Sequence, residues 1–263
     1  MMKSVTLKWM MLALVSWMLP MQITAADGDS LQLLWIGNSF SFTNDIPGIV
    51  KDIAASQQVK LSVTRFLKPG ERFSGHLKNK ELVNALKRGG WDYVILQGFS
   101  STPAYSTESV IHDIYPYAHT LDSLAKVHSP NVHIIYYMTW GHKYGNVRQT
   151  DYPLDDTYEL MQERIKTTYL EMTHANNGWC APVGMAWWRT RTEHPEYQLY
   201  VADCFHPSLL GSYLSANVIF TTIYQRRYQT NVTRDIPIDQ AENLQQIAQE
   251  TVLGNLKLWN VGQ

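Results

Sequence analysis

The sequence predicts an α/β fold, a three-layer α/β/α sandwich built on a five-stranded parallel sheet. Short apolar runs alternate with longer helical patterns along the chain after residue 26, and this alternation is typical of βαβ units. The composition is 45% hydrophobic and 17% charged, as in globular proteins with an ample core. No repeat, low-complexity tract or linker divides residues 27–263, so we expect them to form one domain.

Each expected strand is a short apolar run that ends at turn residues such as Gly, Asn or Pro. The expected strands are residues 31–36, 59–66, 93–97, 132–137 and 181–187. Helical patterns follow each of them, at residues 46–57, 81–88, 109–128, 155–175, 208–228 and 239–258. Because helices separate all the strands, we expect the strands to be parallel, with their carboxyl ends at one edge of the sheet.

The first 26 residues have the pattern of a secretory signal peptide. Lys3 and Lys8 form a positive start, residues 9–21 are apolar, and Thr24-Ala25-Ala26 resembles a cleavage site. The apolar run is too short to span a membrane comfortably, and the segment has no cysteine that could carry a lipid. We therefore predict a secreted or periplasmic protein with no stable membrane insertion after cleavage.

Charge and composition limit the classes of molecule that the protein is expected to bind. The formal net charge is −1 and no basic block is present, so nucleic-acid binding has no electrostatic support. The 9 Trp and 15 Tyr residues would suit stacking on sugar rings as well as a core. No metal-ligand spacing such as H-E-x-x-H or C-x-x-C occurs, so we expect neither a metal site nor a cofactor.

The two cysteines allow two interpretations. In an oxidising compartment, Cys180 and Cys204 could form a disulfide that braces the loop around His206. They could equally be two separate buried thiols, because the sequence does not give the separation that a disulfide requires.

Ser39 lies in the turn between the first expected strand and its helix. A hydroxyl there would meet the unpaired N–H groups of the helix start, which favour an oxyanion. Ser39 could instead cap the helix, although Ser41 or Thr43 could take that role. Asp203 and His206 stand three residues apart in a polar loop, a spacing that lets a carboxylate orient an imidazole base. The alternative for this pair is an Asp that caps a turn and a surface His.

Three more residues follow the carboxyl ends of other expected strands. Gly70 could offer a backbone N–H to an oxyanion and allow close approach of a substrate. Gln97 could donate its side-chain amide to the same charge. Trp140 could line the substrate pocket or belong to the core. Because parallel strand ends share one edge, we expect all three to lie near Ser39.

This combination resembles the SGNH (GDSL-like) hydrolase superfamily over nearly all of residues 27–263. Gly37-Asn38-Ser39, Gly70 and Asp203-x-x-His206 match three of its four blocks. In the third block, Leu96-Gln97-Gly98 replaces the usual Asn motif and looks like the Gln-Gly block of sialate O-acetylesterase-like carbohydrate esterases. The overall pattern is similar to an uncharacterised branch found in gut Bacteroidetes.

The resemblance implies a flavodoxin-like sandwich and a role for each matching residue. Ser39 would be the nucleophile, His206 the base and then the acid, and Asp203 the residue that orients His206. The N–H groups of Ser39 and Gly70 and the amide of Gln97 would form the oxyanion hole.

We therefore predict an exported serine esterase that removes O-acetyl groups from carbohydrate, with a glycan or small-molecule ester as its substrate. One alternative is a lipase or thioesterase that acts on longer acyl chains. Another is a non-catalytic carbohydrate-binding protein on the same scaffold.

Overall fold

The sheet is parallel throughout and has the strand order β2-β1-β3-β4-β5. This computed structural model describes residues 30–146 and 156–262, so the predicted signal peptide lies outside the described residues. The strands are β1 (Leu31–Gly37), β2 (Leu61–Leu67), β3 (Tyr93–Leu96), β4 (His133–Tyr137) and β5 (Trp179–Ala181). The predicted α/β sandwich with five parallel strands is confirmed.

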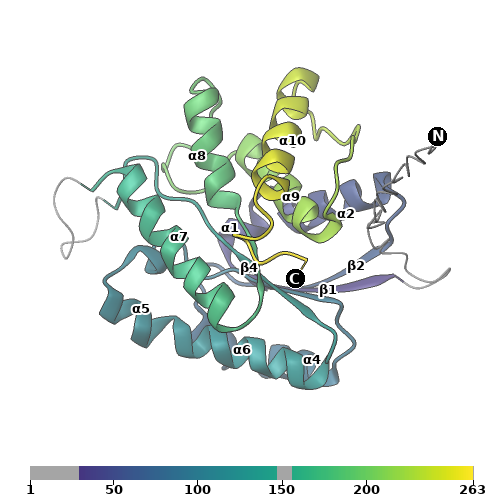
Figure 1. The fold of residues 1–263 in the computed structure, drawn as a ribbon, viewed down its shortest axis with the longest axis vertical. Helices are drawn as coiled ribbons and strands as arrows, with labels where there is room; N and C mark the ends of the chain where they lie inside the picture. The colour runs from purple at the N-terminus through teal and green to yellow at the C-terminus, as the bar shows by residue number, and fades with distance from the viewer. Residues whose placement is uncertain (1–29, 147–155, 263) are drawn as a thin grey trace, which may run out of the picture.

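Helices cover both faces of the sheet (Figure 1). One layer contains α2 (Ile46–Ser56), α8 (Val183–Glu193), α9 (Leu209–Tyr224) and α10 (Ile238–Leu253). The other contains α4 (Lys80–Arg88), α5 (Thr107–Asp113), α6 (Tyr115–His128) and α7 (Tyr158–Ala175). Crossovers between parallel strands are right-handed, so the chain changes faces where the strand order reverses. In this order the reversal lies between β1 and β3, where such sheets bind their ligands.

Short helical turns join the strand ends to the long helices. They are α1 (Ser39–Phe42), η1 (Thr43–Asp45), α3 (Phe73–His76) and η2 (Thr102–Ala104). All four begin within six residues of a strand's carboxyl end, so they build the edge at which the expected site lies.

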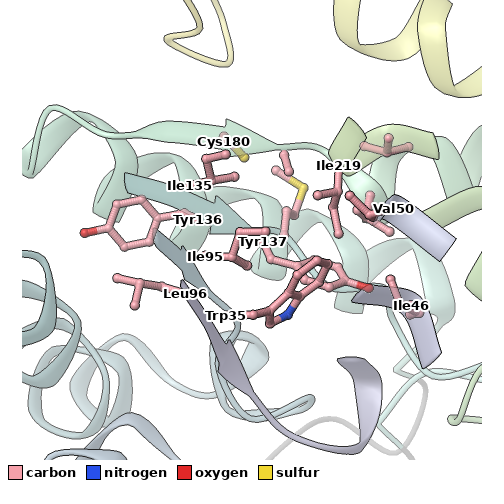
Figure 2. Packing of buried hydrophobic residues seen from close by; sticks show 14 of the residues in the cluster. Trp35, Ile46, Val50, Ile95, Leu96, Ile135, Tyr136, Tyr137, Cys180 and Ile219 are labelled. Atoms are coloured by element: carbon pink, nitrogen blue, oxygen red, sulfur yellow. The ribbon is translucent and has the colours of Figure 1, made fainter. Parts of the chain in front are cut away.

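The central strands are buried on both faces, as expected for a parallel sheet between two helical layers. Residues 33–36 of β1 have no exposed surface. Trp35, Ile95 and Ile135 share one face by register, and Figure 2 shows this side facing Val50 of α2 and Ile219 of α9. This continuous apolar core fixes the positions of the strand ends.

Two of the expected elements are wrong. Residues 181–187 are not the fifth strand, because β5 ends at Ala181 and α8 begins at Val183 after Pro182. Most of this part of α8 is buried, and a buried helix has no polar face. Its sequence therefore lacks the helical periodicity of apolar and polar residues and resembles a buried strand.

The expected helix over residues 109–128 is two helices. It breaks at Ile114, whose φ and ψ of −123° and −60° are not helical. Pro116 follows within the first turn of α6 and has no N–H for the hydrogen bond that a continuous helix would need.

The cysteines are separate thiols. Cys180 is buried in β5, Cys204 is partly exposed, and both are free. Of the two interpretations, the structure favours the one without a disulfide. Among the described helices, none is both long and apolar enough to cross a membrane.

Candidate active site

Ser39 is the first residue of α1, directly beyond the end of β1. The helix is capped by Asn38, whose Oδ1 accepts the Phe40 N–H at 3.1 Å. None of the expected capping residues, Ser39, Ser41 or Thr43, has this role for α1. The Ser39 hydroxyl is therefore available for other contacts.

The Ser39 hydroxyl, the His206 ring and the Asp203 carboxylate form one hydrogen-bonded chain. Ser39 Oγ lies 2.8 Å from His206 Nε2, although the two residues are 167 positions apart. His206 Nδ1 lies 2.7 Å from Asp203 Oδ2. A carboxylate accepts and cannot donate when ionised, so Nδ1 carries the proton and Nε2 accepts the Ser39 hydroxyl. The structure brings the three residues into this order.

Backbone N–H groups hold the Asp203 carboxylate. Its Oδ1 accepts the N–H of Phe205 at 3.0 Å and of His206 at 2.9 Å. Burial by itself would raise the pKa of Asp203, but these bonds and the one with the His206 ring hold that pKa below its ordinary value. The carboxylate is therefore ionised at neutral pH, as a group that stabilises an imidazolium must be.

The loop that carries the pair is a tight reversal before α9. The Val201 N–H donates to His206 O at 3.1 Å, and the Ser208 N–H donates to Leu199 O at 2.8 Å. At the tip, Cys204 has a φ of +68°. The side chains of His206 and Asp203 keep 27% and 35% of their surface exposed, so the pair lies at an open surface.

Trp140 supports this loop from the core of the protein. It has no exposed surface, and its ring stacks between Phe40 at 4.5 Å and Trp187 at 4.0 Å. Its Nε1–H donates to Phe205 O at 3.0 Å, and the edge of the His206 ring contacts Phe40. The prediction that Trp140 lines the substrate pocket is wrong, because a fully buried ring offers no surface to a ligand.

Gln97 is also buried, and all its polar atoms are occupied. Its Oε1 accepts the Asn38 N–H and the Ser41 hydroxyl, both at 2.9 Å. Its Nε2 donates to Asn38 Oδ1 at 3.0 Å and to Gly98 O. The expected third oxyanion donor is therefore wrong, since no hydrogen of this amide is free for a substrate. Gln97 instead fixes the turn from which Ser39 projects.

Gly70 lies at the same edge as Ser39. Asn38 Nδ2 donates to the carbonyl of the next residue, Glu71, at 3.1 Å. Gly70 has a φ of +64°, a conformation that favours glycine. Among the described residues, no hydrogen-bond acceptor faces the N–H of Gly70 or of Ser39. Two free donors therefore lie at the edge where an oxyanion would form.

Comparisons with solved structures identify the fold. A DUF4886 family protein from Bacteroides uniformis matches with a TM-score of 0.71 and 18% identity, over 86% of this chain and 95% of its own. A candidate SGNH hydrolase from Slackia heliotrinireducens matches with a TM-score of 0.62 and 23% identity, over 74% of this chain and 100% of its own. The chain has the SGNH hydrolase fold.

An acetylxylan esterase from Geobacillus stearothermophilus has the same fold. It matches with a TM-score of 0.51 and 18% identity, over 78% of this chain and 98% of its own. No family model matches the sequence, and no curated protein matches it either. The fold that the motif resemblance implied is confirmed.

Two supports of this SGNH-fold site were missed in the sequence. Asn38 could have been found, because Asn before a helix is a preferred capping residue. His76 gave no signal: it is 3% exposed, and its Nε2 hydrogen-bonds Gly37 O at 3.0 Å, below the Ser39 turn. Burial lowers the pKa of His76, although the bond to Gly37 and the nearby Glu71 oppose this effect.

Proposed function

We propose that this protein is an exported serine esterase that removes O-acetyl groups from carbohydrate. The observation that carries the proposal is the hydrogen-bonded chain of Ser39, His206 and Asp203. A serine hydroxyl is a weak nucleophile by itself and becomes reactive when an oriented imidazole accepts its proton. Export rests on the predicted signal peptide.

In the first half of the reaction, Ser39 Oγ attacks the ester carbonyl and its proton moves to His206 Nε2. The imidazolium that forms is stabilised by the ionised Asp203. His206 then returns the proton to the sugar oxygen, which leaves as an alcohol while Ser39 retains the acetyl group. In the second half, His206 takes a proton from water as the water oxygen attacks the acetyl-serine. His206 then returns this proton to Ser39 Oγ, so the Ser39–acetyl bond breaks and acetic acid leaves and ionises to acetate.

The negative charge of each tetrahedral intermediate would meet the free N–H groups of Ser39 and Gly70. Donors that are already in place need no reorganisation when the charge develops. Gln97 gives the intermediate no donor of its own. It acts by holding the turn from which Ser39 projects.

Three observations support a carbohydrate ester. The site is open at the surface, as a bulky glycan requires. Phe42, three residues after Ser39, is 40% exposed and could stack on a sugar ring. A structure with the same fold is that of an acetylxylan esterase.

The first experiment compares wild type with Ser39→Ala on p-nitrophenyl acetate, with Ser123→Ala on α6 as the control. Loss of a triad serine lowers kcat by roughly 10⁶-fold in a well-studied serine hydrolase, so we expect the Ser39→Ala rate to fall to background. A fluorophosphonate probe should label wild type and Ser123→Ala, but not Ser39→Ala. An unchanged rate or unchanged labelling in Ser39→Ala would reject the mechanism.

The preferred acyl chain length and the carbohydrate are identified with the active wild-type protein. A deacetylase should hydrolyse acetyl esters faster than octanoyl esters, whereas a lipase or thioesterase should show the reverse. Release of acetate from a panel of acetylated glycans then identifies the carbohydrate.

A further inference from the structure

The Arg72 side chain is partly buried and lies against an aromatic ring. Its guanidinium lies 4.9 Å above the centre of the Phe99 ring. Four other arginines are ion-paired, namely Arg65, Arg164, Arg189 and Arg234. Among the described residues, no carboxylate pairs with Arg72. Its positive charge is therefore available to a ligand.

The pair of Arg72 and Phe99 lies beside the proposed nucleophile. Each follows a residue whose carbonyl oxygen contacts the Asn38 amide: Asn38 Nδ2 is 3.1 Å from Glu71 O and 3.3 Å from Gly98 O. Asn38 directly precedes Ser39. The aromatic ring also adjoins Gly70, since a methyl group at Gly70 would lie 3.9 Å from Phe99. Both side chains thus belong to the edge of the proposed oxyanion site.

The acidic groups near this edge already have partners other than Arg72. Glu71 pairs with Lys68 at 2.6 Å, and the hydrogen bond with Lys68 lowers the pKa of Glu71. Asp203 is hydrogen-bonded to the His206 ring and to backbone N–H groups. Neither carboxylate forms an ion pair with Arg72 among the described residues.

We propose that Arg72 binds the carboxylate of an acidic sugar that carries the acetyl ester. This inference rests on the proposed function and narrows its substrate class to esters of uronic-acid-type sugars. The guanidinium can keep its face on Phe99 while its outer edge donates two parallel hydrogen bonds to a carboxylate. Because the ring already holds the guanidinium in place, little side-chain freedom is lost on binding.

The test compares two substrates that differ only in the charged group, an O-acetylated methyl glucuronoside and the matching methyl glucoside. We expect wild type to have a kcat/KM about tenfold or more higher for the uronoside, the size expected for a charge-assisted contact. Arg72→Gln should reduce this ratio to near one, mainly by raising KM for the uronoside. A third substrate, an O-acetylated glucose 6-sulfate derivative, shows whether the site selects a carboxylate or any anion.

Arg88→Gln is the matched control. Arg88 also lies over an aromatic ring, Trp91 at 5.6 Å, but at the end of α4 rather than at the Ser39 edge. Arg88→Gln should leave the ratio of kcat/KM for the uronoside to kcat/KM for the glucoside at its wild-type value. Arg72→Lys keeps the charge without the planar fork and should give an intermediate ratio.

A second measurement does not depend on any variant. The preference of wild type for the uronoside should weaken in 0.5 M NaCl, since the contact is electrostatic and partly exposed. If wild type shows no preference, or if Arg72→Gln retains it, this inference is wrong and the esterase proposal stands. If wild type does not hydrolyse p-nitrophenyl acetate, the esterase proposal itself is wrong.

Discussion

The two halves of the proposed active site are held in place by different forces. On the nucleophile side, the turn that carries Ser39 is fixed by hydrogen bonds to the buried Gln97 amide. On the base side, the loop that carries His206 is partly exposed and lies over the stacked rings of Phe40, Trp140 and Trp187.

The difference shows what each half needs. Hydrogen bonds depend strongly on direction, so a buried network sets the angle at which the nucleophile projects. Stacked rings supply a firm but less directional support. A direct hydrogen bond from Trp140 to Phe205 O links that support to the base loop. The nucleophile side should therefore be the more sensitive half to a single substitution.

Among the substitutions that test this difference between the two halves, Gln97→Ala should have the largest effect on stability and kcat. The change leaves the Asn38 N–H and the Ser41 hydroxyl buried without their acceptor, so unfolding free energy should fall by about 2–4 kcal/mol. A loosened turn should also lower kcat about 10- to 100-fold, since small misplacements of a reacting group are costly. Urea denaturation and p-nitrophenyl acetate kinetics measure the two effects.

Gln162→Ala is the control for this prediction. Gln162 is a second fully buried glutamine, and it accepts the Gly141 N–H at 2.7 Å in the turn after β4. Gln162→Ala should lower the unfolding free energy about as much as Gln97→Ala does, with a much smaller loss of kcat. Equal losses of kcat in the two variants would show that Gln97 has no special link to Ser39.

An intermediate effect is expected for Trp140→Phe on the base side. The stack is kept in part, but Phe205 O loses its donor, so unfolding free energy should fall by about 1–2 kcal/mol and kcat by up to about tenfold. Trp187→Phe removes the same atoms from the same stack, while its lost hydrogen bond goes to Ser215 and not to the loop. If both variants lose kcat equally, the Trp140 bond does not position the base.

The smallest effect is a dependence of stability on pH through His76. Because burial lowers its folded pKa, the unfolded chain binds a proton at a higher pH, near its ordinary value of about 6.5. His76 therefore contributes stability that is complete above about pH 6.5 and is lost as the pH falls toward the folded pKa.

Denaturation at pH 7.5 and 5 compares wild type with His76→Gln, which keeps a donor for Gly37 O but cannot titrate. Wild type should lose more unfolding free energy on acidification than the variant. The same loss in both would mean that His76 does not make the nucleophile side sensitive to acid.

Much of the fold could be predicted, because the central strands are apolar runs with clear turn residues at their ends. The ends of β1 and β3 were found to within one residue. The failures fall where burial hides the periodicity, at α8, and where one proline divides a helical pattern, before Pro116.

At the site, residue type and spacing made Ser39, Asp203 and His206 candidates but left alternatives open, and the motif resemblance predicted their meeting. The roles expected for Gln97 and Trp140 were wrong for one shared reason. Both follow strand ends at the correct edge, but sequence position does not tell whether a side chain points toward the substrate or into the core. Both point inward and act as supports.

By itself, the sequence determined the order of the first four strands, and with it the edge of the sheet where the reactive residues gather. Apolar runs of these lengths must be buried, and parallel strands bring their carboxyl ends together. Only the tertiary structure decided which polar groups at that edge remain free, because this depends on whether a partner from a distant segment already occupies them. The N–H groups of Ser39 and Gly70 and the charge of Arg72 have no such partner among the described residues, whereas the amide of Gln97 does.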